Sequence, residues 1–235
     1  MNNSIFELKK ELKIIANPKK AKLLSGYFKT GKGEYGEGDV FLGITVPLSR
    51  QLARKYKDLN FSEITELLQS KFHEERLIAL LILVHNFSLK NAKNKKEIYE
   101  FYLKNTSHIN NWDLVDLSSH EIVGGYLLDK NAEILMKLAK SKNIWERRIA
   151  VISTFEFIRN NRFEESLKLA EMLLQDEHDL MHKAVGWMLR EIGKRELETE
   201  IKFLDKHCKE MPRTMLRYAI EKFPEKIRKA YLKGK

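Results

Sequence analysis

The residue types that could do chemistry are concentrated between Asn110 and Asp116, where a tryptophan precedes two carboxylates. Asp113 and Asp116 are three residues apart, so a helix would turn both carboxylates to roughly one side. Trp112 and Asp116 are four residues apart, which places the indole over that same side. An aromatic face beside a carboxylate suits a developing cation. The stretch is therefore a candidate site for stabilising positive charge.

The same stretch also fits an ordinary helix start. In that interpretation Asn110 or Asn111 is the N-cap, the acidic residues lie in the first turn, and Trp112 is half buried. Leu114 and Val115 face a core in either case. These residues by themselves leave both interpretations open.

The elements that position this stretch are predicted to be helices. The chain has 235 residues and only four prolines, and its apolar residues recur at spacings of three and four. The clearest apolar stripes are Ile5-Phe6-Leu8-Leu12-Ile15, Ile64-Leu67-Leu68, Ile78-Leu81-Ile82-Val84, Ile134-Leu135-Leu138 and Leu167-Leu169-Leu173. No alternating run is long enough to require a sheet.

Turn-forming residues divide these stripes into about a dozen helices of ordinary length. We expect breaks at Asn17-Pro18, Thr30 to Asp39, Pro47, Lys90 to Lys96, Asn160-Asn161, Pro212 and Pro224. None of them has the composition of a domain linker. We therefore expect residues 1–235 to form a single α-helical repeat domain.

A weak internal period supports the repeat interpretation. Similar four-residue segments begin at residues 76, 112, 148, 183 and 217, with spacings of 36, 36, 35 and 34 residues. Stacked helical repeats of roughly 34 to 47 residues bury their apolar faces on one another and present an extended concave surface. The segments are Arg76–Ala79, Trp112–Val115, Arg148–Val151, Lys183–Gly186 and Arg217–Ile220. We predict an all-α superhelical stack of such repeats.

The charge is positive and uneven. The net charge is +10, and residues 201–235 hold 11 Lys and Arg against 4 Asp and Glu. Four of the five repeat segments begin with Arg or Lys, which predicts a row of cations on a basic concave surface. Such a surface suits duplex DNA, because phosphate contacts supply much of the affinity without reading sequence. A solvated lysine-rich surface is the alternative.

Several other function classes are disfavoured. The single cysteine, Cys208, excludes an internal disulfide and fits a reducing cytosol. No apolar run approaches the roughly 20 residues of a membrane span, and the N-terminus lacks a signal-peptide core. We expect a cytoplasmic, nucleoid-associated monomer that does not bind membranes.

No cofactor or metal ion is expected. Gly31, Gly33 and Gly36 have the spacing G-x-G-x-x-G, but no hydrophobic strand precedes them. His178 and His182 are four apart, yet no third ligand has recognisable spacing, so a solvated helix start is the better interpretation.

Taken together, these residues resemble the AlkD-like DNA alkylation-repair proteins, a family with HEAT-like repeats that includes N-glycosylases releasing alkylated purines. The resemblance covers nearly the whole chain. It rests on Asn17-Pro18-Lys19-Lys20-Ala21, Tyr27, Phe41-Leu42-Gly43-Ile44, Pro47, Trp112-Asp113, Asp116, Trp145, Arg148, Lys183-Ala184-Val185-Gly186-Trp187 and Leu189-Arg190-Glu191.

The resemblance implies a role for each candidate residue. Asp116 would be the catalytic carboxylate, with Trp112 and Arg148 in the same site. The DNA-binding residues would be Tyr27, Lys183, Trp187, Arg190, Arg213 and Arg217. The implied function is hydrolysis of the N-glycosidic bond of cationic N3- or N7-alkylated purines in duplex DNA.

One segment departs from the family pattern. Typical members pass quickly from the tyrosine at the position of Tyr27 to the Phe-Leu-Gly-Ile segment, whereas here Thr30 to Asp39 intervene. Glycines recur through this insertion, which predicts a flexible or tightly turned loop. The insertion resembles a subgroup whose members need not be glycosylases. The alternative function is therefore a non-catalytic repeat protein that recognises damaged, bent or branched DNA.

Overall fold

The computed structural model describes residues 4–89 and 94–234, and the regular structure in these ranges is helical. The only bridge of β type between described residues is an isolated one that joins Val40 to Phe72. The all-α prediction is confirmed. None of the described helices has the length and apolar character needed to cross a membrane. Of the predicted break at Lys90 to Lys96, residues 90–93 lie outside the described residues.

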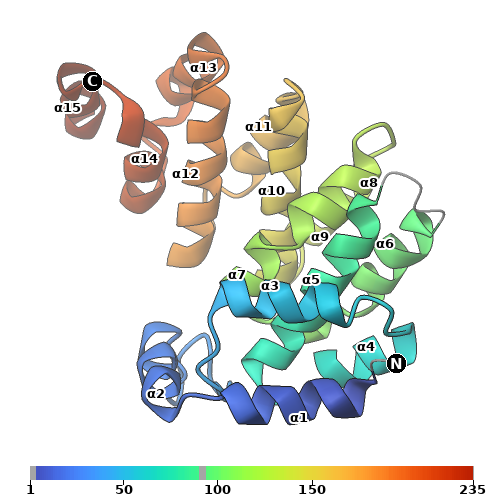
Figure 1. Cartoon of the computed structure of the whole chain (residues 1–235). Helices are drawn as coiled ribbons and strands as arrows, with labels where there is room; N and C mark the ends of the chain where they lie inside the picture. The colour runs from blue at the N-terminus through green and yellow to red at the C-terminus, as the bar shows by residue number, and fades with distance from the viewer. Residues whose placement is uncertain (1–3, 90–93, 235) are drawn as a thin grey trace. The chain divides into compact units, whose positions relative to one another are not determined.

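Two compact units divide the chain, Met1–Ser118 and Ser119–Lys235, and Figure 1 labels their helices. The first unit contains α1 (Ile5–Ile15), α2 (Pro18–Tyr27), α3 (Val46–Lys55), α4 (Phe61–Leu68), α5 (His73–Ser88), α6 (Lys95–Lys104), the 3₁₀ turn η1 (Thr106–His108) and α7 (Trp112–Asp116). The second contains the π-helical turn η2 (His120–Gly124), α8 (Gly125–Leu127), α9 (Glu133–Ala139), α10 (Ile144–Arg159), α11 (Glu164–Met172), α12 (Asp179–Gly193), α13 (Leu197–His207), α14 (Arg213–Ala219), the 3₁₀ turn η3 (Ile220–Lys222) and α15 (Glu225–Lys233).

Helix α5 is the centre of the first unit. Its residues 77–83 are all buried, because the run is apolar around the whole helix. Helices α3, α4, α6 and α7 all contact α5. The short catalytic candidate α7 is thus held against the best-buried helix of its unit.

Helix α1 buries a narrower stripe than its sequence predicts. Leu8 and Leu12 are fully buried, whereas Phe6 is 75% and Ile15 is 36% exposed. Polar contacts add to the attachment of α1, since the Glu11 carboxylate accepts a hydrogen bond from the Tyr56 hydroxyl at 2.9 Å.

The helix boundaries follow the predicted punctuation. Asn17 caps α2 by accepting a hydrogen bond from the Lys20 amide, and Pro18 occupies the first helical position. Pro212 and Pro224 directly precede α14 and α15. These breaks are confirmed. Proline has no backbone N–H and a fixed φ, so it is tolerated at the start of a helix but interrupts a helix that precedes it.

In the second unit, helices that follow one another along the chain are also neighbours in space. Helix α10 contacts α9, α11 and α12, and α12 contacts α13 and α14; Figure 1 shows α10, α12 and α14 in succession from yellow to red. Residues 149–152 of α10 are all buried. Neighbour-to-neighbour packing of this kind is that of a helical repeat stack.

The two longest buried helices also reveal the register of the repeat. The Arg76 guanidinium donates to the Ser70 carbonyl at 2.8 Å, and the Arg147 guanidinium donates to the Ser141 carbonyl at 2.9 Å. Each arginine also pairs with an aspartate. The structural equivalent of Arg76 is therefore Arg147, and the alignment of Arg76 with Arg148 is wrong by one residue.

The predicted row of surface cations also needs correction at its first position. The side chain of Arg76 is buried and forms an ion pair with Asp39 at 2.6 Å. A buried, paired guanidinium is not available to a phosphate, so Arg76 belongs to the interior of the first unit.

Candidate functional site

Helix α7 carries the candidate catalytic residues at its two ends. The side chain of Asn111 caps the helix and accepts a hydrogen bond from the Trp112 amide at 2.8 Å. Leu114 and Val115 are fully buried, which confirms that they face the core. Trp112 and Asp116 are half-buried. The interpretation of the stretch as a capped helix start with a half-buried Trp112 is confirmed. Its interpretation as a site that stabilises positive charge stays a prediction.

Asp113 has an environment quite different from that of Asp116. It is buried, and its Oδ2 atom lies 2.8 Å from Nε2 of His73. The other ring nitrogen of His73, Nδ1, lies 3.0 Å from Oδ2 of Asp39. One imidazole thus joins two carboxylates that are far apart in the sequence.

The network extends beyond the imidazole. The Arg76 guanidinium donates to Asp39 Oδ1 at 2.6 Å, and the Asn111 amide donates to Asp39 Oδ2 at 3.2 Å. Burial lowers the pKa of His73, but the hydrogen bonds to Asp113 and Asp39 outweigh it and raise the pKa to about 9. His73 is therefore a cation at neutral pH.

The pKa of Asp39 moves the opposite way. Burial favours its neutral form, yet the hydrogen bond to His73 and the charge of Arg76 hold this pKa below its usual value. Two cations and two anions then occupy the interior beneath α7. Such a network fixes geometry, because each buried charge depends on its partner.

The inserted loop supplies Asp39 to this network. Its first half is tightly turned, since the Glu34 carboxylate accepts from the Gly31 amide and the Glu37 carboxylate accepts from the Gly33 amide, each at 2.8 Å. The prediction of a tightly turned loop is confirmed.

Glycine is required where the loop returns to the unit. A side chain at Gly36 would meet the Phe28 carbonyl oxygen at 2.4 Å. The Asp39 amide donates to the Gly36 carbonyl at 3.1 Å, and Val40 then pairs with the segment before α5. The close approach at Gly36 thus aims Asp39 at His73.

Aromatic rings support Trp112 from the side of α2. Phe28 stacks on Trp112 with ring centroids 5.0 Å apart and an interplanar angle of 13°. Tyr27 meets the indole edge-on at 5.9 Å. Tyr27 is 64% exposed. The structure thus brings together two of the residues that the sequence assigned to the site, Tyr27 and Trp112.

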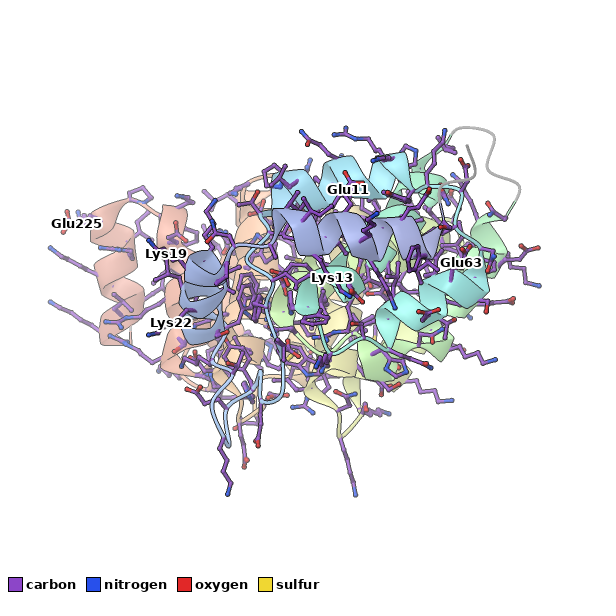
Figure 2. All side chains as sticks on the ribbon, turned by 60° about the horizontal axis from the view of Figure 1, so that its bottom comes forward. Glu11, Lys13, Lys19, Lys22, Glu63 and Glu225 are labelled. Carbon is purple, nitrogen blue, oxygen red and sulfur yellow. The ribbon has the colours of Figure 1, made fainter. Side chains whose placement is uncertain are left out.

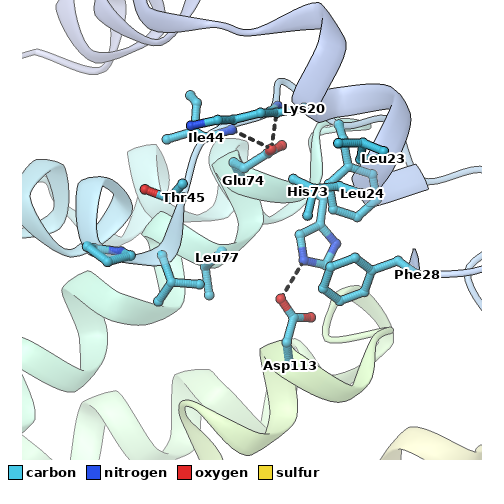
Figure 3. A pocket seen from close by; sticks show the side chains of 14 residues that line it. Lys20, Leu23, Leu24, Phe28, Ile44, Thr45, His73, Glu74, Leu77 and Asp113 are labelled. Atoms are coloured by element: carbon cyan, nitrogen blue, oxygen red, sulfur yellow. Dashed lines mark hydrogen bonds and ion pairs between the residues drawn. The ribbon is translucent and has the colours of Figure 1, made fainter. Parts of the chain in front are cut away.

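A cavity of about 390 Å³ opens beside this cluster, between α2 and the start of α5. Figure 3 shows His73 between Glu74 and Asp113, with Phe28 beside its ring. The Glu74 carboxylate is fully used, because it accepts from the backbone amides of residues 42, 43 and 44 at 2.9, 2.8 and 3.1 Å. The lining of the cavity is mostly apolar, and the Glu74 carboxylate within it is satisfied by the protein's own backbone.

Helix α2, along one side of the cavity, contains no buried residue. Its exposed side chains include Lys19, Lys20, Lys22 and Leu23. Figure 2 shows Lys19 and Lys22 along this helix. The helix therefore presents a basic, accessible surface next to Tyr27.

The remaining predicted catalytic residue, Arg148, lies on α10 in the second unit. It is buried, and its guanidinium donates to the Leu180 carbonyl at 2.6 Å. Trp187 lies on α12 in the same unit and is half-buried. Its indole donates to Glu191 at 3.0 Å. Both side chains are held by neighbouring groups.

The predicted phosphate-binding residues of the second unit differ in whether their side chains already have partners within the protein. Arg190 forms ion pairs with Glu221 and Glu191, and Lys183 pairs with Asp179 at 2.6 Å. The Arg213 guanidinium donates to the Leu232 carbonyl at 2.6 Å. Arg217 is exposed. Of these four residues, Arg217 needs the least rearrangement to meet a phosphate.

Glu200 is a buried acid near Arg190 that the sequence did not single out. It is only 1% exposed, and its Oε1 atom has no hydrogen-bond partner among the described residues. Burial raises its pKa to about 8, although the charge of Arg190 opposes this shift. Glu200 is therefore largely protonated at neutral pH.

The two histidines with metal-ligand spacing have local structural roles. His178 caps α12 and accepts a hydrogen bond from the Leu180 amide at 3.1 Å. His182 contacts the Asp176 carbonyl oxygen. In residues 4–89 and 94–234, no cluster of three or more His, Cys, Asp or Glu side chains is arranged to hold a metal ion.

Sequence reasoning missed the buried network of Asp39 and His73. A usable signal was the run His73-Glu74-Glu75-Arg76, in which four ionisable residues open a helix that is apolar immediately afterwards. Charges at the entrance to a fully buried helix must find partners. The identity of those partners was not readable from spacing, because Asp39 lies 34 residues away.

A family model shows the family of this chain, and two solved structures share its fold. A family model described as "DNA alkylation repair enzyme" matches residues 8–223. A predicted DNA alkylation repair enzyme from Enterococcus faecalis is similar in structure, with a TM-score of 0.68, 18% identity, and coverage of 89% of this chain and 97% of that chain. The smu.31 protein from Streptococcus mutans UA159 has a TM-score of 0.55, 22% identity, and coverage of 77% and 93%. Among curated proteins there is no match.

Proposed function

Because this chain belongs to the family of DNA alkylation repair enzymes, we propose that it is a DNA-alkylpurine N-glycosylase. Its substrate is double-stranded DNA that carries a cationic N3- or N7-alkylated purine. The family implies a role in the repair of alkylated DNA, and DNA as the partner. The release of the damaged base is the step that we propose for this chain.

The observation that carries the proposal is the construction of α7. Its first residue, Trp112, is supported by the stacked ring of Phe28 and the edge of Tyr27. Its last residue, Asp116, is half-buried. Between them, the ion pair of Asp113 with His73 ties the helix to the core. Catalytic groups held on a rigid element in this way need little reorganisation during the reaction.

Cleavage of the glycosidic bond is favoured by negative charge and by an aromatic face near the sugar, which becomes positively charged. The alkylated purine is already positive, so when the bond from C1′ to the base nitrogen breaks, the electron pair neutralises the departing base. The sugar becomes oxocarbenium-like. A water molecule then adds to C1′ and gives up a proton, which Asp116 accepts. The products are the free base and an abasic site.

Typical interaction energies indicate which of Trp112 and Asp116 contributes more to the reaction rate. A cation held over an aromatic face gains ~0.5 to 2 kcal/mol, which bounds the contribution of Trp112. Removal of one preorganised electrostatic group typically costs ~2.7 to 4 kcal/mol. Asp116 therefore contributes more to the rate than Trp112. For Arg148 and Trp187, the roles implied by the resemblance stay predictions.

Binding to DNA rests on cations that a phosphate can reach. Arg217 is exposed on α14, and Lys19, Lys20 and Lys22 are exposed on α2. Contacts of this kind attach the protein to any duplex and position it without reading bases. Recognition of damage then rests with α7 and Tyr27.

Purified protein incubated with duplex DNA containing 7-methylguanine tests the proposal. We expect time-dependent release of free 7-methylguanine and the appearance of alkali-labile abasic sites, without release of guanine. Protein that binds the methylated duplex tightly and releases no base would instead support the non-catalytic DNA-binding alternative.

A further inference from the structure

A second basic site lies in the first unit, away from α7. Helices α3 and α5 contact each other, and a hollow of about 170 Å³ opens between them. Three cationic or cation-forming side chains line it: Arg50 and Arg54 of α3, and His85 of α5. The two arginines are four residues apart, so they project from one face of the helix.

The hollow has no carboxylate in its lining. Its floor consists of Ala53, Leu81 and Val84, and the Ser88 hydroxyl at its rim donates to the His85 carbonyl at 2.8 Å. Among residues 4–89 and 94–234, neither Arg50 nor Arg54 has a hydrogen-bond or ion-pair partner. The next residue along α3, Lys55, is by contrast paired with Glu11 at 2.6 Å.

Some other exposed cations of the protein have a partner on their own helix. Lys168, Lys202 and Lys229 each pair with a glutamate four residues earlier on the same helix. Two like charges at this helical spacing repel each other. The arrangement of Arg50 and Arg54 is therefore unfavourable by itself and becomes favourable when an anion lies between them.

The preference for cations near helix C-termini explains the positions of only some of these side chains. Arg54 and His85 lie in the last turns of α3 and α5, where cations favour the negative end of the helix dipole. That explanation covers neither Arg50, in the middle of α3, nor the hollow.

We propose that Arg50, Arg54 and His85 form a phosphate-binding site. Guanidinium groups bind phosphate oxygens in a bidentate manner, and this geometry is specific for planar pairs of acceptors. Both arginines are exposed, so a ligand can reach them from solvent. The ligand chemistry is a phosphate group, carried either by the DNA backbone or by a free phosphate compound. The site requires no base release by α7, and it adds a contact that the candidate residues above do not include.

The test uses the full-length protein and three variants. Arg50→Gln with Arg54→Gln removes the two guanidinium groups, whereas Arg50→Lys with Arg54→Lys keeps the charge and loses the bidentate geometry. Lys168→Gln with Lys202→Gln is the matched control, since it removes two exposed charges that already have partners. Each protein is titrated with inorganic phosphate, followed by ³¹P NMR, and with an undamaged duplex over a series of salt concentrations.

For the DNA backbone as the source, the Arg50→Gln, Arg54→Gln variant should bind the duplex about tenfold or more weakly than wild type at low salt. The slope of log affinity against log salt should fall by about 0.9, the value for one phosphate. The lysine variant should keep the slope and lose part of the affinity. The control should change neither.

For a free phosphate compound as the source, the same glutamine variant should lose binding of inorganic phosphate while its affinity for the duplex stays at the wild-type value. A glutamine variant that matches the control in both titrations would overturn the proposal. So would a wild-type protein that binds neither ligand. Since no arm measures base release, failure here is distinct from failure of the glycosylase proposal.

Discussion

Nε2 of His73 lies 2.8 Å from Oδ2 of Asp113, the residue that directly follows Trp112. The position of α7 is therefore tied to a buried charge on α5. Because His73 also binds Asp39, the inserted loop, the central helix and the candidate catalytic helix share one electrostatic network.

Replacement of His73 by Gln should strongly destabilise the first unit. Loss of one partner of a buried ion pair leaves an uncompensated charge and typically costs ~3 to 5 kcal/mol. Urea unfolding of His73→Gln measures the effect. The half-buried His108 gives a matched control, and His108→Gln should unfold near the wild-type midpoint. Equal midpoints for the two variants would contradict the role of His73.

The stability that His73 contributes should depend on pH. The folded pKa of His73 is about 9, raised from 6.5. The folded state therefore binds this proton more tightly than the unfolded state, and the contribution is complete below pH 6.5 and is lost as the pH rises through 9. The difference in unfolding free energy between wild type and His73→Gln should shrink across this window. A difference that grows with pH would reverse the sign and refute the assignment.

Asp116→Asn should remove catalysis and keep binding. The substitution preserves shape and removes the negative charge, so excision of 7-methylguanine should fall by roughly 100-fold or more. Affinity for the methylated duplex should hold or rise slightly, because a carboxylate facing DNA repels phosphate. Single-turnover base release and fluorescence anisotropy measure the two effects. Exposed Asp58 provides the control variant Asp58→Asn, which should release base at the wild-type rate.

Arg217→Ala should weaken binding to every duplex to the same extent. Arg217 is exposed, and the loss of one phosphate contact should reduce the salt slope of binding by about 0.9. Anisotropy titrations with several unrelated duplexes measure it, and Arg217→Lys should retain the slope. A loss confined to one sequence would mean that Arg217 contacts a base.

Glu200→Gln should stabilise the protein near and above neutral pH. The folded pKa of Glu200 is about 8, raised from 4.5, so the folded state holds a proton that the unfolded state has released. Stability therefore falls as the pH rises from 4.5 to 8, and the glutamine variant should lack this fall. Thermal unfolding across that range measures it, with the exposed Glu198→Gln as control. A parallel pH dependence in wild type and Glu200→Gln would show that Glu200 is not the source.

Local signals in the sequence were sufficient for the elements and for α7. Asn17, Pro18, Pro212 and Pro224 act on the residues beside them, so the helix boundaries that they predict are confirmed. The burial of Leu114 and Val115 follows from helical periodicity in the same way. Helix caps and breaks can be predicted from the sequence because the groups that interact lie within a few residues of one another.

Partners distant in the sequence could not be predicted. Local residues indicate that His73 and Arg76 need partners but do not identify Asp39 as the partner, and the repeat pattern by itself predicts Arg76 in a surface row. The register error at Arg148 has the same origin, because Arg147 and Arg148 are both compatible with the repeat. Their side chains differ in burial and in the neighbours that they reach: half-buried Arg147 pairs with Asp176, and buried Arg148 donates to the Leu180 carbonyl.

The loop that carries Asp39 has a consequence for how such a chain can change over evolutionary time. With His73 protonated, the charges of Asp39, Asp113, His73 and Arg76 sum to zero in the interior of one unit. A deletion that removes the loop together with Asp39 takes away the carboxylate that pairs with the buried Arg76, and one of the two carboxylates that pair with His73. His73 can adapt by losing its proton, because the hydrogen bond to Asp39 is one cause of its raised pKa. Arg76 cannot lose its charge in this way, so we expect a shorter loop to occur together with a neutral residue in place of Arg76.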